Sequence, residues 1–263
     1  MQRESDQAAP FNWVSIVNDR ADLDLAFNAL DGWGHFHTDT IRGRIRSLQL
    51  RPADALDHFK KAEARVDDFP RTLRNQLRRF YLKIYAFENA LIFESDPDGG
   101  DPQATDRAMK ELQETDLPES EVASQIRHSC RAMFALHRKN YASAKKIFSR
   151  LIDQSRDRMG DEKVDFFLGN AVAMRALNET DTAERNIETA SLYIPALDNV
   201  FNMGHYACRL SALLKLWDQE DRAQEWDDFI HRLKIPASTA ELFCERERRI
   251  LGRSAALQRV FLF

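Results

Sequence analysis

Residues that could carry acid–base or metal chemistry are scattered along this chain of 263 residues. The tightest histidine pair, His35 and His37, lies beside Asp39, but side chains two positions apart do not share a helix face. A structural zinc site needs four ligands, and no set of Cys and His residues has the required spacing. The neighbouring carboxylates Asp227 and Asp228 fit solvated charges on a helix better than an acid–base pair. We therefore expect neither a metal nor a cofactor.

Nucleophilic chemistry has no stronger signal in the sequence. Cys130, Cys208 and Cys244 are an odd, widely spaced set without a C-x-x-C motif, which is typical of free thiols packed as small apolar side chains in a reducing compartment. The sequence has no nucleophile elbow, HExxH motif or glycine-rich phosphate loop in a strand-to-helix context. It predicts a cytoplasmic, non-catalytic protein, while a site built from residues distant in sequence stays open.

The charge of the chain bears on nucleic-acid binding. A formal net charge of -4 argues against a general polyanion binder, because neutralising phosphates requires an accumulated positive surface. Two local basic clusters are a helical stripe of Arg71, Arg74, Arg78, Arg79 and Lys83, and a group of Arg246, Arg248, Arg249 and Arg253 that alternates with Glu245 and Glu247. Solvated helix faces explain both clusters. Nucleic-acid binding through the 71–83 stripe is kept as an alternative.

The elements that must position these residues are helical. Nine glycines and eight prolines are few for this length, and they fall mostly between long stretches of good helix formers. An all-α fold is therefore predicted. No apolar run approaches the roughly 18 to 20 residues that a membrane span needs, and residues 1–10 are polar, so we expect neither a membrane span nor a secretory signal.

Apolar residues at three- and four-residue steps divide the chain into successive helices. The longest follows Pro70 and runs to Glu94. Further helices are expected at 141–154, 164–177, 181–193, 200–216, 220–233 and 238–257. One alanine in each second helix recurs after 40, 39 and 40 residues, at Ala104, Ala144, Ala183 and Ala223. This regular step predicts an array of helical hairpins.

Residue identities then point to a family. The second helices carry a small residue followed four positions later by a large one, as in Ala55 with Phe59, Ala144 with Phe148, and Ala183 with Ile187, Ala190 and Pro195. This pattern resembles the second half of a tetratricopeptide repeat over roughly residues 36–233, with Gly43 as the small residue of the first hairpin. The step exceeds that family's 34 residues and overlaps HEAT-type arrays. Asp227 also stands where a large apolar residue belongs, so we expect Trp226, Phe229 and Ile230 in the core instead.

The resemblance implies a right-handed α-solenoid of about five antiparallel hairpins with capping helices at both ends. The expected organisation is a flexible start with N-terminal caps over 1–35, helical repeats over 36–236, and a C-terminal capping helix with an apolar tail over 237–263. First helices of such an array line a concave groove that suits a peptide or a helix. Groove positions implied in this way are Thr40, Arg44, Ser129, Met133, Leu168, Arg175, Cys208, Ala212 and Lys215.

The function implied by the resemblance is a non-catalytic protein–protein scaffold, adaptor or assembly factor, whose partner is a protein or peptide. One alternative is a regulatory sensor that binds a peptide or small ligand and changes the curvature of the solenoid. Self-association is also possible. Residues 218–228 contain six acidic side chains against Arg222 alone, whereas the 71–83 helix is basic, so opposite ends could attract one another.

Overall fold

The computed structural model describes residues 23–28, 30, 36–66, 72–96, 100–116, 120–155 and 162–255. Every regular element within these ranges is a helix, which confirms the predicted all-α class. Residues 1–22 of the expected N-terminal region and the apolar tail at 260–263 lie outside the described residues. Among the described residues, no helix combines the length and the apolar character needed to cross a membrane.

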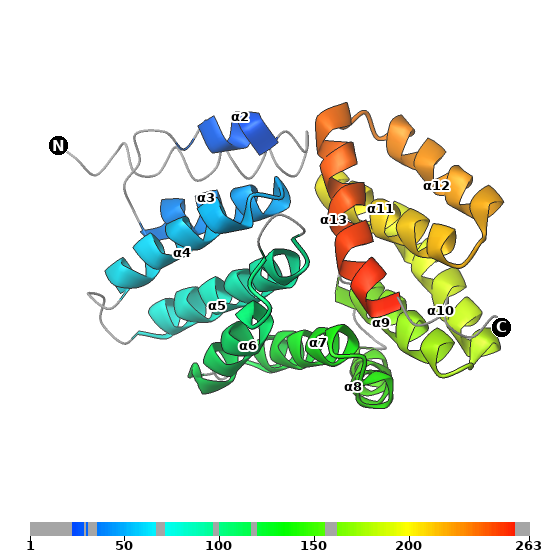
Figure 1. The fold of residues 1–263 in the computed structure, drawn as a ribbon, viewed down its shortest axis with the longest axis horizontal. Helices are drawn as coiled ribbons and strands as arrows, with labels where there is room; N and C mark the ends of the chain where they lie inside the picture. The colour runs from blue at the N-terminus through cyan, green and yellow to red at the C-terminus, as the bar shows by residue number, and fades with distance from the viewer. Residues whose placement is uncertain are drawn as a thin grey trace.

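The helices follow one another with short connections (Figure 1). In chain order they are α2 (Leu23–Asn28), α3 (Phe36–Leu48), α4 (Pro52–Val66), α5 (Leu73–Glu94), α6 (Ala104–Glu114), α7 (Glu121–His137), α8 (Tyr141–Gln154), α9 (Glu162–Ala176), α10 (Thr180–Tyr193), the short 3₁₀ helix η3 (Ile194–Ala196), α11 (Val200–Leu216), α12 (Glu220–Arg232) and α13 (Ala237–Ala255). From α8 onward the observed bounds lie within two residues of the predicted ones. Hydrophobic periodicity therefore located the elements well.

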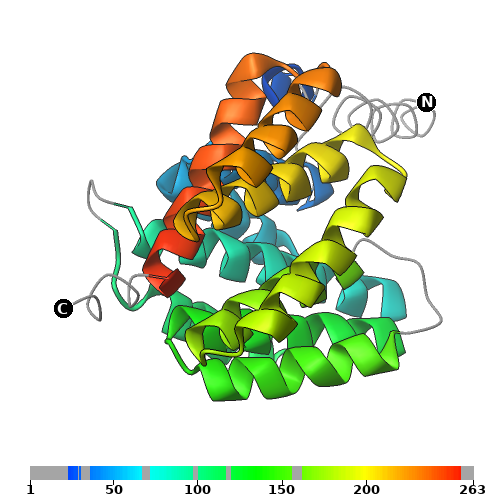
Figure 2. The ribbon, with the colours of Figure 1, turned by 90° about the vertical axis from the view of Figure 1, so that its right-hand side faces the viewer.

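Alternate helices form an inner layer. The inner helices contact one another in the order α3, α5, α7, α9 and α11. Each of them also contacts the helix that follows it in the chain. Helices α4, α6, α8, α10 and α12 are the second members of these pairs. Figures 1 and 2 show the succession curving round, so that the inner helices surround a common centre.

Helix α13 occupies part of that centre. The sequence suggested a cap on the last hairpin, and α13 does pack on α11, but it also contacts α3, α5 and α7. It thereby links the last hairpin to inner helices from the first half of the chain (Figure 1). The side of the array that the resemblance implied to be an open groove thus carries a helix of the same chain.

The turns inside four hairpins are alike. Leu50, Lys139, Asn178 and Asp218 each adopt a left-handed conformation, with φ of 56°, 58°, 63° and 57°. In each case the N–H of the next residue donates to the carbonyl five residues before it, as Asn140 N–H does to Ala135. This hydrogen bond pairs a carbonyl at the C-terminal end of the first helix that would otherwise have no donor. The left-handed residue stands five positions before Ala55, Ala144, Ala183 and Ala223, respectively. The repeat seen in the sequence is therefore also a repeat of backbone geometry.

Small residues allow close packing between helices. Ala55, Ala144, Ala183 and Ala223 have no exposed surface. A Cβ atom at Gly169 would lie 2.4 Å from Cζ of Phe148, far inside van der Waals contact. The phenylalanine ring of α8 thus fills space that only a glycine on α9 leaves open.

A glycine also faces a phenylalanine ring within the first hairpin, between α3 and α4, whereas the last hairpin is packed differently. A Cβ atom at Gly43 would lie 2.4 Å from Cε1 of Phe59. In the last hairpin, Asp227 replaces the large apolar residue and accepts hydrogen bonds from Ser211 Oγ and Lys215 Nζ, both at 2.6 Å. The core prediction is confirmed there, with Ile230 buried and Trp226 and Phe229 packed against the core.

Candidate functional site

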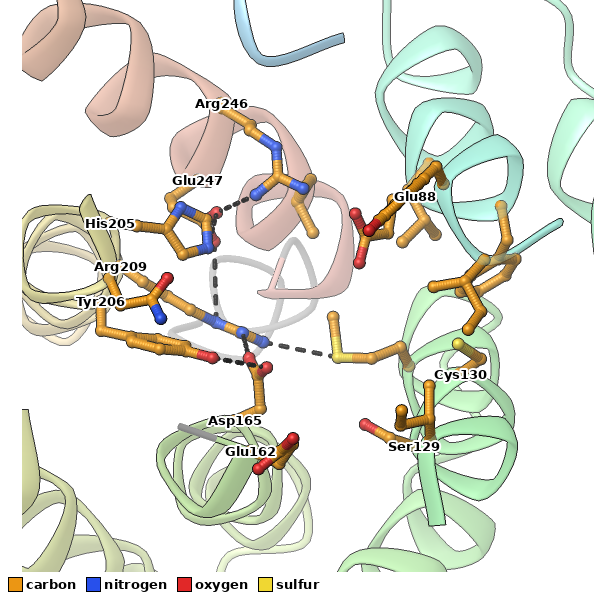
Figure 3. A pocket seen from close by; sticks show the side chains of 18 of the residues that line it. Glu88, Ser129, Cys130, Glu162, Asp165, His205, Tyr206, Arg209, Arg246 and Glu247 are labelled. Atoms are coloured by element: carbon orange, nitrogen blue, oxygen red, sulfur yellow. Dashed lines mark hydrogen bonds and ion pairs between the residues drawn. The ribbon is translucent and has the colours of Figure 1, made fainter. Parts of the chain in front are cut away.

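A cavity of about 300 Å³ lies between the inner helices and α13 (Figure 3). All five inner helices and α13 contribute to its wall. The polar lining residues are Arg44 of α3, Glu88 of α5, Ser129 of α7, Glu162 and Asp165 of α9, Asn202, His205 and Arg209 of α11, and Arg246 and Glu247 of α13. Such a concentration of charge at the centre of a fold is costly unless the groups are paired or used.

Helical periodicity brings the lining residues to one face of each helix. On α11 the cavity residues Asn202, His205, Tyr206 and Arg209 follow the steps of three, four and seven residues that define a single stripe. The same steps place Tyr81, Ile84, Tyr85 and Glu88 on α5, and Ile126, Ser129, Cys130 and Met133 on α7. A polar stripe on a helix as apolar as α11 is the sequence signal that could have revealed this site.

Four charged side chains of the cavity form one network. Arg209 of α11 pairs with Asp165 of α9, and its Nε lies 3.6 Å from Oε2 of Glu247. Oε1 of Glu247 accepts from Nη1 of Arg246 at 2.6 Å. The Tyr206 hydroxyl donates to Oδ2 of Asp165 at 2.9 Å. Helices α9, α11 and α13 are therefore connected through alternating charges, which gives the buried Arg209, Arg246 and Glu247 their counter-charges.

Two members of this network correct a sequence interpretation. Arg246 and Glu247 belong to the C-terminal cluster that was assigned to a solvated helix face. The structure buries both, with 7% and 1% of their surface exposed. The assignment was wrong for these two residues because α13 turns this face toward the centre of the fold, whereas Arg248 on another face stays exposed.

His205 lies beside the network as a neutral ring. Its Nε2 is 3.6 Å from Oε1 of Glu247, and its ring stacks on Phe201 with centroids 6.2 Å apart. Burial, reinforced by the charge of Arg246, holds the pKa of His205 well below its ordinary value of 6.5. The imidazole therefore offers the cavity a hydrogen-bonding group without a positive charge at neutral pH.

Arg44 and Glu88 are charged groups outside the network. The Arg44 guanidinium lies 4.8 Å from the centre of the Tyr85 ring and 5.9 Å from that of Phe201. Among the described residues neither Arg44 nor Glu88 has a hydrogen bond or an ion pair, although the charge of each acts on the pKa of the other. Burial raises the pKa of Glu88, against the opposing effect of Arg246 and Arg44. Figure 3 shows Glu88 on the α5 side of the cavity, across from Arg246 and Glu247 of α13.

The structure distributes the predicted groove residues unevenly. Arg44, Ser129 and Met133 line the cavity. Arg175 does not, because its guanidinium lies 5.3 Å from the centre of the Trp217 ring. Lys215 bonds instead to Asp227, as described above.

The remaining predicted groove residues belong to the interior. Thr40, Leu168, Cys208 and Ala212 are buried, with at most 5% of their surface exposed. The analogy placed them on an accessible surface, but the close approach of the helices covers them. Cys208 has a specific neighbour, since its Sγ lies 2.7 Å from Sγ of Cys244 on α13.

The predicted basic stripe is only partly described. Arg71 lies outside the described residues, as does the side chain of Arg74. Arg78 bonds to Oδ1 of Asn75 at 3.4 Å, and Arg79 is half-buried. Lys83 forms ion pairs with Glu63 and, at 2.9 Å, with Glu111. These carboxylates compensate the charge of Lys83 and weaken the positive field of this helix.

Other candidates for chemistry were also located. His35 and the side chain of His37 lie outside the described residues. Within the described ranges no group of three or more His, Cys, Asp or Glu side chains could hold a metal ion. Burial raises the pKa of Cys130, so its thiol at the cavity wall stays protonated and is a poor nucleophile.

Comparisons of the chain with protein-family models, with curated proteins and with solved structures found no match. The function is therefore inferred from the arrangement of the cavity itself.

Proposed function

We propose that this chain is a non-catalytic, cytoplasmic sensor that binds a small polar ligand in its central cavity. The scaffold in this proposal is a right-handed α-solenoid of the tetratricopeptide type. Two observations support this scaffold. Alternate helices of the chain contact one another to form the inner layer, and a left-handed turn residue recurs five positions before a buried alanine. The observation that carries the function is the convergence of charged side chains from five helices, α3, α5, α9, α11 and α13, on one cavity.

The size of the cavity favours a small ligand over a helix. A volume of about 300 Å³ is at the lower end of small-molecule sites. A helix with its side chains is about 10–12 Å across and needs an open groove. Helix α13 lies against α3, α5, α7 and α11 and takes up that space. The sensor alternative therefore has more support than a scaffold with an open groove.

The position of α13 also supplies a route from ligand to conformation. It contributes Arg246 and Glu247 to the cavity and contacts inner helices from both halves of the chain. A ligand that pairs with these walls favours the arrangement in which α13 and the inner helices are close together. Ligand binding is thus expected to compact the molecule and raise its melting temperature.

Native mass spectrometry tests the proposal. Purified protein is incubated with the small-molecule fraction of a cell extract, and retained ligands are identified by their mass. Wild type is compared with the cavity variants Arg44→Gln and Glu88→Gln, and with matched controls Arg175→Gln and Glu241→Gln outside the cavity. We expect wild type and both controls to retain the same ligand, and both cavity variants to retain much less of it. Retention by all five proteins places binding elsewhere, and retention by none contradicts the proposal.

A further inference from the structure

We propose that the ligand is a zwitterion with a free carboxylate and a free ammonium group, of the size of an apolar amino acid or dipeptide. This inference rests on the proposed function and names the ligand class of the same cavity. In this arrangement the ligand carboxylate binds Arg44 of α3, and the ligand ammonium binds Glu88 of α5.

The charge balance of the cavity leads to this pair. Asp165, Arg209, Glu247 and Arg246 compensate one another's charge through the contacts given above, although Nε of Arg209 and Nε of Arg246 have no hydrogen-bond acceptor. The carboxylate of Glu162 begins α9 at the exposed rim. Arg44 and Glu88 also face the cavity, and each has only the longer-range charge of the other residue and its neighbours rather than a direct ion pair. A ligand that carries one charge of each sign compensates both without disturbing the network.

Arg44 is prepared to bind a carboxylate. The ring of Tyr85 lies 4.8 Å from its guanidinium and restricts where the group can move. A contact between a cation and a ring uses none of the N–H donors as a conventional hydrogen bond, so the donors of Arg44 stay available. The N–H edge of the guanidinium matches a carboxylate with two parallel hydrogen bonds.

Glu88 is suited to an ammonium group. Its half-buried carboxyl group faces the cavity and has no hydrogen-bond donor among the described residues. A ligand ammonium would supply both hydrogen-bond donors and a compensating charge. Residues Ile84, Leu91, Ile126 and Ile250 add an apolar wall, which suits an aliphatic or aromatic ligand side chain.

Ligands with a single kind of charge fit less well. An anion alone would neutralise Arg44 and so remove one of the two positive charges that compensate Glu88. A metal cation would meet Glu88 while being repelled by Arg44, Arg209 and Arg246 on the other walls. A zwitterion avoids both costs.

Titration calorimetry with a matched panel tests the inference. Leucine, phenylalanine and the dipeptide Leu-Leu are each compared with their N-acetyl and C-terminal amide forms. We expect free zwitterions to bind, and each blocking group to weaken binding by at least about tenfold, because a charged hydrogen bond is lost. Glu88→Gln should remove the effect of acetylation while preserving that of the amide, and Arg44→Gln should do the reverse.

Folding of the variants is checked separately. Glu88→Gln replaces a carboxyl group whose ionisation is disfavoured by burial, so it should be at least as stable as wild type. Arg44→Lys keeps the charge but loses the planar fork, and should bind zwitterions more weakly than wild type while retaining the preference for a free carboxylate.

The outcomes separate the two proposals. If a blocked compound binds as tightly as its free form, the zwitterion inference is wrong and a small-ligand site remains. If no panel member binds but the extract yields a ligand dependent on Glu88, the inference is also overturned and the proposed function stands. If neither the panel nor the extract yields a ligand, both proposals fail.

Discussion

The Sγ atoms of Cys208 and Cys244 lie 2.7 Å apart and join helix α11 to helix α13. Cys208 is buried, whereas Cys244 is partly exposed. Interaction with the Cys208 thiol lowers the pKa of Cys244. The contact with Cys244, together with burial, raises the pKa of Cys208. Cys244 is therefore the more nucleophilic partner, placed beside a second thiol.

Oxidised glutathione should convert this pair to a disulfide. The Cys244 thiolate displaces one reduced glutathione, and Cys208 then displaces the second, so the protein loses two hydrogen atoms in total. Peptide mass spectrometry should find a Cys208–Cys244 crosslink. In a Cys208→Ala variant the reaction should stop at a glutathione adduct on Cys244. A stable adduct without a crosslink in wild type would contradict the placement of α13 on α11.

Gly169→Ala should destabilise the fold by about 1–3 kcal/mol, because the added methyl group overlaps the Phe148 ring. Gly252 is a matched control on α13, since a Cβ atom there would meet nothing within 4 Å. Gly252→Ala should be neutral or stabilise by up to about 1 kcal/mol through helix propensity. Urea denaturation measures both changes. Equal free energies of unfolding for the two variants would refute the close contact between α8 and α9.

Glu94 connects helices α5, α6 and α7, and its ionisation should make the free energy of unfolding depend on pH. Its carboxylate accepts from Nη1 of Arg138 at 2.6 Å and from the Thr105 N–H at 3.3 Å, and it lies 3.3 Å from Nε2 of His137. Burial opposes its ionisation, but the hydrogen bonds from Arg138 and Thr105 lower the pKa of Glu94 below its ordinary 4.5.

Glu94→Gln should therefore lower the free energy of unfolding at neutral pH by about 2 kcal/mol. Because the folded pKa is depressed, the wild-type advantage should be complete above pH 4.5 and disappear as pH falls through the folded value. Chemical denaturation at several pH values checks this, with exposed Glu114→Gln as control. An advantage that persists in strong acid would rule out the ionised form of Glu94 as its source.

His205 should stay neutral where an ordinary histidine is protonated. Arg246, Arg209 and Arg44 surround it together with Asp165, and burial is the main cause of its lowered pKa. Nitrogen NMR should show a neutral imidazole at about pH 6, with the signal assigned by its absence in His205→Asn. Since the unfolded chain takes up this proton first, wild-type stability should fall as pH drops below 6.5. Protonation of His205 at its ordinary pKa would contradict the burial described here.

The sequence by itself determined the elements of this protein. Hydrophobic periodicity located the helices, and the spacing of Ala144, Ala183 and Ala223 marked a repeat that the turns at Lys139, Asn178 and Asp218 share. These features are local: a helix face, a small residue and a turn depend on neighbours within a few positions. The pairing of Gly43 with Phe59 was also predictable, because both belong to one hairpin.

Only the tertiary structure decided where the site lies. Glu88, Asp165, Arg209 and Arg246 belong to four helices, and their distances depend on the accumulated curvature of the array and on the return of α13 to its centre. A small rotation at each hairpin adds up over the chain, so local sequence does not specify which distant faces meet. For the same reason the sequence pattern predicts that Arg246 and Glu247 are surface charges, whereas the fold buries both.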